Sequence, residues 1–321
     1  MRLAKLDENV INKKLAMPVI LPSNFKLADK GVRITEKLVA ALKRYGFSSV
    51  YVDEPGIVFD TKTTLTDGQR LKIIRQLQVL YEKLIHNNFN EFELSRFIAG
   101  EILPEVPNGP VSLPLSKPGD SHDIAEHSLN VCLLSVAVAR NLNLEPKNIE
   151  AIAKAALLHD FGKLVQNNKH NQGRHEEAAY EILKSNTYSV LVYTAVRFHH
   201  ETIDGEGPAK LPKEKQNEAV RVLSLCNYYE NLASGNSLLP HECFEKLQSL
   251  VNIKFDLHVY EAFKKSIYLY PVGLPVKLNN KKLAVVVGQN DDFPFRPIVR
   301  TENERYDLMK CLSLFIEEIV I

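Results

Sequence analysis

The sequence predicts a mainly α-helical protein with a small α+β unit at residues 1–66 and a short antiparallel β segment at residues 271–321. Three observations support this fold class. Helical patterns of apolar residues fill residues 121–268 almost without interruption. Strand-like and helical stretches alternate in residues 1–60, and after Pro271 apolar runs are broken by Asn-Asn and Gln-Asn-Asp-Asp turns. The length of 321 residues allows two domains, or one large domain with appendages.

The N-terminal unit is predicted to contain three strands and a helix. In FKLADKGVRI (25–34), a turn at Gly31 leads into one short strand. KLAMPVIL (14–21) and SSVYVD (48–53) are typical of strands, whereas TEKLVAALKRYG (35–46) is typical of a helix. Thr35 is the expected N-cap of that helix and Gly46 its expected C′ residue. The unit contains no evident catalytic cluster, so we expect a regulatory or dimerisation module.

Residues 67–103 are predicted to connect this unit to the rest of the chain. DGQRLKIIRQLQVLYEKLIHN (67–87) is an amphipathic helix that either mediates dimerisation or simply packs on a neighbour. Five prolines forbid a regular helix in residues 104–120, which we interpret as a Pro-rich linker and domain boundary.

The segment 121–270 is predicted to be a helical domain. Its helices are expected at 121–142, 147–160, 175–185, 189–200 and 214–234, with one or two more in 241–268. The loops are short except for a polar stretch, 164–174. The last stretch, RYDLMKCLSLFIEEIVI (305–321), fits either a helix or a strand.

Composition excludes several classes of function. Lys+Arg 40 and Asp+Glu 39 give a net charge of +1, so no global attraction to a nucleic-acid polymer or an anionic membrane is indicated. No apolar run approaches the roughly 20 residues that a membrane span requires, and the N-terminus has no signal-peptide core. The four cysteines lack CxxC spacing, as expected of buried residues in a reducing compartment. We therefore expect a cytoplasmic protein without membrane insertion.

Histidines and a carboxylate occur at the apolar ends of several predicted helices. AALLHDFGKL (155–164) ends a buried helix in His159 and Asp160, which costs desolvation energy unless something binds both side chains. Imidazole and carboxylate are ligands for Fe, Mn, Co, Ni or Zn, and helix bundles build metal sites from facing helices. We therefore predict a metal site from His127, His159, Asp160, His175, His199 and His200.

The spacing of these residues favours two ions. Adjacent residues on a helix diverge by about 100°, so His159-Asp160 and His199-His200 can each reach two different metals. Asp160 can bridge two cations with its two oxygens. Lys163 lies four residues after His159 and would point at whatever the metals bind. A phosphate suits two metals and a lysine, and a solvated surface lysine is the alternative interpretation of Lys163.

The motifs HDIAEHSLNV, AALLHDFGKL, RHEEAA and HHETIDGEGPAKL together resemble the HD-GYP subgroup of the HD-domain metallophosphohydrolases, over residues 121–265. The resemblance implies an all-α domain of the HD type with two or three divalent ions, Fe, Mn or similar, and hydrolysis of cyclic di-GMP to pGpG or GMP. It implies that the six residues above are metal ligands, with Asp160 as the bridge, and that Lys163 contacts phosphate. Asp123 stands where some members have a third-metal Glu, or is a plain first-turn helix residue.

The chain also departs from the family pattern. The GYP Tyr is absent, although Asp204, Gly205 and Gly207 remain as expected substrate-binding positions. Asn227 stands where the family has a metal-binding Asp, and Asn130 where it has an Arg. The loop LVQNNKHNQGR (164–174) is shorter and more polar than usual. An amide oxygen can still ligate a divalent cation, but more weakly because it carries no charge.

The leading functional hypothesis is therefore a metal-dependent cyclic di-GMP phosphodiesterase of bacterial second-messenger signalling, with Asp160 and Lys163 as catalytic residues. A hydrolase of another nucleotide is an alternative, because the missing Tyr and altered loop affect substrate fit. A third hypothesis is a degenerate domain that binds cyclic di-GMP, or a partner such as a diguanylate cyclase, without hydrolysis. A purely structural helical protein is the remaining functional hypothesis. A homodimer is a separate prediction about assembly.

Overall fold

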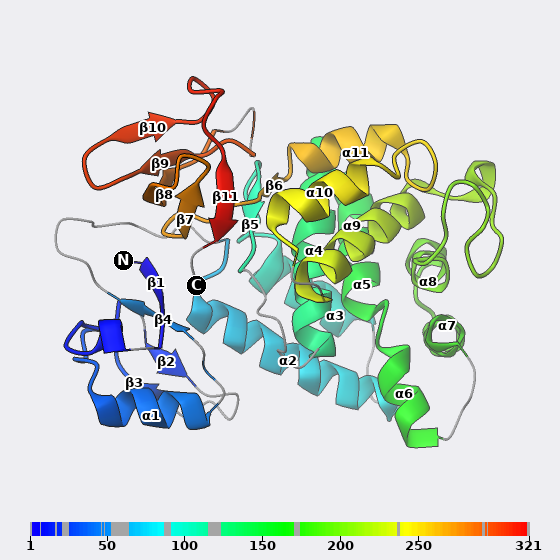
Figure 1. The fold of residues 1–321 in the computed structure, drawn as a ribbon. Helices are drawn as coiled ribbons and strands as arrows, with labels where there is room; N and C mark the ends of the chain where they lie inside the picture. The colour runs from blue at the N-terminus through cyan, green and yellow to red at the C-terminus, as the bar shows by residue number, and fades with distance from the viewer. Residues whose placement is uncertain are drawn as a thin grey trace. The chain divides into compact units, whose positions relative to one another are not determined.

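The chain forms two compact units in the computed structural model, which describes all residues except 1, 7, 17, 21–25, 46, 48, 53–63, 87–90, 115–122, 170–173, 236–237, 291–292, 294 and 320–321. One unit combines Met1–Lys62 with Tyr270–Ile321, and the other is Thr63–Leu269 (Figure 1). The predicted connecting helix and most of the predicted linker thus fall in the same unit as the helical segment. The described helices include none that is both long and apolar enough to cross a bilayer.

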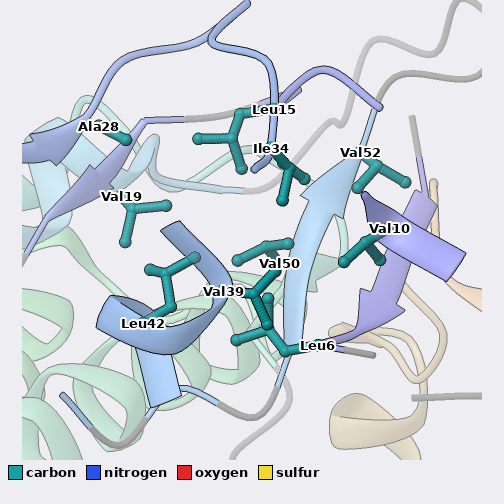
Figure 2. Packing of buried hydrophobic residues seen from close by; sticks show 10 residues of the cluster. All are labelled: Leu6, Val10, Leu15, Val19, Ala28, Ile34, Val39, Leu42, Val50 and Val52. Atoms are coloured by element: carbon teal, nitrogen blue, oxygen red, sulfur yellow. The ribbon is translucent and has the colours of Figure 1, made fainter. Parts of the chain in front are cut away.

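The N-terminal part of the first unit has the predicted α+β character. β1 (Arg2–Lys5) pairs antiparallel with β4 (Ser49–Val52), and β2 (Val19–Ile20) pairs with β3 (Lys26–Ala28). Helix α1 (Glu36–Arg44) begins after Thr35, whose hydroxyl accepts a hydrogen bond from Leu38 N at 3.2 Å, as expected of an N-cap. Gly46 lies outside the described residues. Figure 2 shows the apolar core of this part, which includes Leu6, Leu15, Ile34, Leu42, Val50 and Val52.

The C-terminal part is a five-stranded antiparallel sheet in the order β10-β9-β8-β7-β11. Its strands are β7 (Pro275–Leu278), β8 (Leu283–Gly288), β9 (Ile298–Arg300), β10 (Arg305–Asp307) and β11 (Ile316–Ile319). The predicted antiparallel segment is confirmed. The ambiguous stretch 305–321 contains two strands, and β11 is fixed by pairing with β7, a neighbour that sequence periodicity does not reveal.

The second unit is a helical bundle, which confirms the predicted fold class. It contains α2 (Asp67–Ile85), α3 (Glu91–Phe97), a π-helix (Ile98–Ile102), α4 (Ile124–Asn141), α5 (Pro146–Leu158), α6 (Gly162–Lys169), α7 (His175–Ser185), α8 (Val190–Arg197), a 3-10 helix (Lys213–Lys215), α9 (Glu218–Gly235), α10 (Pro240–Gln248) and α11 (Leu257–Lys264). A short parallel pair joins β5 (Val111–Ser112) to β6 (Ile267–Tyr268).

Helix α4 lies at the centre of this bundle and brings polar groups into its interior. Residues 127–139 are all buried, and the helix packs against α2, α5, α9 and α11 (Figure 1). A helix that is apolar nearly all round must be surrounded by others. His127 and Asn130 lie in its N-terminal half, so both are enclosed by these neighbours.

Helix α6 corrects the prediction of a polar loop over 164–174. The chain is helical from Gly162 to Lys169, and residues 170–173 lie outside the described part. The run looked like a loop because its polar residues outnumber its apolar ones. Val165 is nevertheless buried, as is Phe161 just before the helix. Burial of these two side chains explains a helix that composition alone disfavours.

Gly162 permits a close approach between α6 and α7. A Cβ at this position would lie 1.9 Å from the backbone oxygen of His175. We expect Gly162→Ala to lower the free energy of unfolding by about 1–3 kcal/mol, because backbone must move to admit the methyl group. Gly68→Ala is the matched control, since nothing lies within 4 Å of its added Cβ. Thermal unfolding should show destabilisation for the first variant only; equal stability of both would refute the steric explanation.

Candidate metal centre

The predicted ligands come from five helical segments that converge in the bundle. His127 lies in the first turn of α4, His159 is the C-cap of α5, and Asp160 follows it. His175 is the first residue of α7, and His199 and His200 follow the end of α8. Asn227 faces them from α9. Helix ends supply most of the ligands because a side chain there can reach the interior without interrupting an apolar helix face.

One group of ligand atoms gathers around Oδ2 of Asp160. His127 Nε2 lies 3.6 Å and His159 Nε2 3.7 Å from this oxygen. The two imidazole nitrogens are 3.1 Å apart, and Asn227 Oδ1 lies 3.1 Å from His127 Nε2. All four side chains are buried. We call His127, His159, Asp160 and Asn227 the inner group.

A second group gathers around the other oxygen of the same carboxylate. Asp160 Oδ1 lies 3.1 Å from His175 Nε2 and 3.8 Å from His199 Nε2. His175 Nε2 is 3.4 Å from His199 Nε2 and 3.3 Å from His200 Nε2. We call Asp160, His175, His199 and His200 the outer group, because His200 is exposed. Asp160 therefore presents one oxygen to each group.

The second nitrogen of four imidazoles is held by a hydrogen-bond acceptor. His159 Nδ1 lies 2.8 Å from Ala156 O, and His199 Nδ1 lies 2.7 Å from Val196 O. Carboxylates occupy this place at the other two: Glu230 bonds His127 Nδ1, and Glu176 Oε2 lies 3.2 Å from His175 Nδ1. These partners assign the proton to Nδ1 and leave the Nε2 lone pair directed into the ligand groups.

The donor set fits divalent cations. Nε2 lone pairs that face each other at 3.1–3.4 Å repel unless a cation or a proton lies between them. Asp160 Oδ1 is buried and accepts no hydrogen bond from the described residues, which leaves a charged oxygen unsatisfied in the interior. A divalent cation could therefore be held at either of two clusters, Asp160-His175-His199-His200 and His127-His159-Asp160. Within each cluster the ligand atoms all lie within 4.8 Å of one another.

Electrostatics keep His159, His199 and Asp160 in the protonation states that bind a metal. Burial lowers the pKa of His159 to about 4 and holds the pKa of His199 well below its usual value, so both are neutral near pH 7. Burial raises the pKa of Asp160, but the neighbouring His159, His175, His199 and Lys163 lower it by more, and the carboxylate stays ionised. Burial lowers the pKa of His127, yet its bond to Glu230 outweighs this and makes the imidazole a stronger base.

Lys163 lies beside the shared carboxylate. Its Nζ donates a hydrogen bond to Asp160 Oδ2, and 43% of its side chain is exposed. Lys163 is therefore partly a solvated surface lysine, as in the alternative interpretation, and partly a partner of Asp160. A half-exposed ammonium next to the ligand groups gives the open side of the site a positive charge.

The remaining predicted residues lie outside both ligand groups. Asp123 is the N-cap of α4: its Oδ1 accepts from Ala125 N at 2.8 Å and its Oδ2 from Gln78 Nε2 at 2.9 Å. This placement matches its interpretation as a first-turn helix residue, and the third-metal role stays a prediction. In the loop after α8, Asp204 Oδ1 accepts a hydrogen bond from Glu206 N at 3.1 Å, and Gly205 has φ +74°. Their binding of substrate also stays a prediction.

Gly207 packs against a buried carboxylate that sequence analysis did not single out. A Cβ at Gly207 would lie 2.7 Å from the Glu201 backbone. Glu201 is 2% exposed and accepts hydrogen bonds from Ala209 N at 2.6 Å and Leu211 N at 2.7 Å. Glu201 therefore holds the loop that follows His200, and Gly207 leaves room for it.

Several supporting residues were also missed. Glu230 and Asn231 follow Asn227 by three and four residues, so helical spacing could have placed all three on one face. Asn231 Nδ2 donates to Asn227 Oδ1 at 2.8 Å and turns that oxygen toward the inner group. Glu176 is adjacent to His175 in the sequence. No local signal pointed to Arg70, which lies far away in the chain.

Comparisons with known proteins agree with this geometry. Residues 124–232 match the family model described as HD domain. A cyclic di-GMP phosphodiesterase of Pseudomonas aeruginosa is 31% identical over 215 residues, which cover 60% of this chain and 51% of that protein. Ribonuclease Y of Petrotoga mobilis is 34% identical over 86 residues, 27% of this chain and 16% of that protein. This chain thus spans about half the length of the first of these relatives and less of the second.

Among solved structures, an HDG"Y"P protein from Bdellovibrio bacteriovorus is similar with a TM-score of 0.48 and 17% identity, covering 81% of this chain and 98% of that one. The match to the HD domain spans α4 to α9, the helices that carry every member of the inner and outer groups. The resemblance predicted from the sequence agrees with this match: residues 124–232 match the HD-domain family model.

Proposed function

We propose that this protein is a metal-dependent phosphodiesterase that hydrolyses cyclic di-GMP to pGpG or GMP. One observation carries the proposal: Asp160 presents one oxygen to each of two adjacent ligand groups. A carboxylate shared in this way suits two ions about 3.5–4 Å apart, the arrangement used in in-line phosphoryl displacement. The 31% identity to the Pseudomonas phosphodiesterase over 215 residues supports cyclic di-GMP as the substrate.

Different residues of this chain would bind the metals and the phosphate. The inner group would hold one ion and the outer group the other, with iron or manganese suited to imidazole and carboxylate ligands. Bound ions would supply Lewis-acid activation of water and of the phosphoryl group. Asp160 orients both ligand groups, and the Lys163 ammonium binds a non-bridging phosphate oxygen on the exposed side. The loop containing Asp204, Gly205 and Gly207 would line the substrate path next to His200. A homodimer and a diguanylate cyclase partner stay predictions.

The test of this proposal is a substrate comparison. Protein purified without oxygen and loaded with Mn(II) or Fe(II) is incubated with cyclic di-GMP, cyclic di-AMP and a short RNA, and the products are separated by chromatography. We expect metal-dependent conversion of cyclic di-GMP at a higher kcat/KM than of the other two. Preference for cyclic di-AMP or RNA would support the alternative hydrolase, and cyclic di-GMP that stays bound but intact would support a receptor.

Asn227 is the observation that favours the receptor alternative. Its amide oxygen leaves the inner group with one carboxylate, Asp160, which it shares with the outer group. We expect Asn227→Asp to tighten binding of one Mn(II) by roughly tenfold, because metal affinity rises with the charge of the ligand set. Titration with Mn(II) measures this effect. If the variant binds metal and turns over substrate as the wild type does, Asn227 does not limit the site.

A further inference from the structure

A line of polar contacts leads from α2 to the metal-binding imidazole of His127. Arg70 of α2 is 8% exposed, and its Nη2 donates to Asn130 Oδ1 at 2.5 Å and to Glu126 Oε1 at 3.0 Å. Asn130 Nδ2 donates to Glu230 Oε1 at 2.9 Å. Glu230 Oε2 in turn bonds Nδ1 of His127. Three hydrogen bonds therefore separate Arg70 from a ligand of the inner group.

The chemistry of each member fixes the direction of this line. A guanidinium can only donate and a carboxylate can only accept. Asn130 must therefore turn its oxygen to Arg70 and its amide hydrogens to Glu230, and Glu230 must accept from Nδ1–H of His127. This tautomer leaves the lone pair on Nε2, where a metal would bind. Without the donor at Arg70, nothing fixes the Asn130 oxygen, so the amide can rotate and its hydrogen bond to Glu230 is no longer held in place.

The outer group contains a comparable arrangement within the HD domain itself. Arg174 Nε donates to Glu176 Oε1 at 2.7 Å, and Glu176 Oε2 lies 3.2 Å from His175 Nδ1. Each ligand group thus contains a carboxylate–imidazole pair with a guanidinium behind it. In the outer group that guanidinium adjoins the ligand in sequence. In the inner group it comes from α2, which lies before the residues that match the HD domain.

We propose that Arg70 is a positioning residue for the inner metal site, acting through Asn130 and Glu230 on the orientation and tautomer of His127. The proposal rests on the proposed function only in requiring that the inner group binds a metal. It makes α2 a structural part of the metal centre, so the HD domain of residues 124–232 lacks one of the groups that order its ligands. Loss of the outer-shell partner of a metal-binding imidazole typically weakens metal affinity by about 10–100-fold.

The test uses the full chain and the variants Arg70→Met and Arg70→Lys. Lys72→Met is the matched control, because Lys72 is an exposed cation of the same helix paired with Glu101. Mn(II) titration gives the affinity of each ion. In the metal-free protein, long-range proton–nitrogen correlations of the histidine side chains give the tautomer of His127, whose signals are identified by their loss in His127→Gln.

We expect Arg70→Met to weaken the binding of one of the two ions by roughly tenfold or more and to leave the affinity for the other unchanged. In the metal-free variant, His127 should populate both tautomers. Arg70→Lys should lose affinity at the same ion, since an ammonium cannot reproduce the fork to Asn130 and Glu126; it also serves as the test if the methionine variant does not fold. Lys72→Met should match the wild type. Wild-type affinities and tautomer in both Arg70 variants would overturn this inference alone, and absence of metal from the wild type would overturn the proposed function with it.

Discussion

Replacing Asp160 with alanine is expected to remove both bound ions and to lower turnover of cyclic di-GMP by roughly 10³-fold or more, because a single carboxylate serves both ligand groups. Its two oxygens lie 3.1 Å from His175 Nε2 and 3.6 Å from His127 Nε2. Elemental analysis of metal content and chromatography of the products measure the two effects. Loss of an ion from one group only would show that Asp160 does not join them.

Asp123→Ala is the matched control for that variant. It also removes a carboxylate near the start of α4, but this one caps the helix and accepts a hydrogen bond from Gln78. We expect the control to keep its metal content and to lose about 0.5–2 kcal/mol of stability, the usual cost of losing an N-cap. A drop in bound metal would instead support the third-metal role of Asp123.

Replacing Lys163 with methionine is expected to separate catalysis from metal binding. The kcat should fall by about 10²–10³-fold, because the ammonium stabilises charge that develops on the phosphate oxygens. Metal affinity should hold or rise, since the Lys163 ammonium no longer pairs with Asp160 Oδ2. Steady-state kinetics and Mn(II) titration measure the two quantities. Lys184→Met, which removes an exposed lysine of α7, is the control and should behave as the wild type.

A parallel loss of metal and activity in Lys163→Met would contradict this division of roles. It would mean that the lysine mainly orients Asp160. An unchanged kcat would mean that Lys163 does not contact the reacting phosphate, and the phosphate contact would then have to come from another cation.

The ligand-bearing helices could be predicted because their signals are local. His159, Asp160 and His199 follow apolar runs that can only be buried, and adjacent polar residues at such ends are costly unless they bind something. The angular spacing of residues on a helix then predicted that His159-Asp160 and His199-His200 can each reach two metals. The structure places the six predicted histidine and aspartate ligands in two touching groups, although their service as ligands stays a prediction.

What could not be predicted depends on contacts between distant parts of the chain. Arg70 reaches Asn130 across 60 positions, and Asn130 reaches Glu230 across 100. In the sequence Asn130 was only a departure from the family pattern, whereas in the structure it joins a cation to an anion. Helix α6 was missed for a related reason, because burial of Val165 depends on tertiary packing rather than on the polar residues around it.

The central claim is that one carboxylate joins two ion sites. Magnetic coupling between the two ions of the manganese-loaded protein tests this claim most directly. Protein loaded with Mn(II) to saturation and examined by electron paramagnetic resonance should contain two ions per chain with the spectrum of an exchange-coupled pair. His200→Ala should convert that spectrum to one of a single, uncoupled ion, because the outer group alone loses a ligand. Two uncoupled ions, or a single ion in the wild-type protein, would contradict the shared role of Asp160.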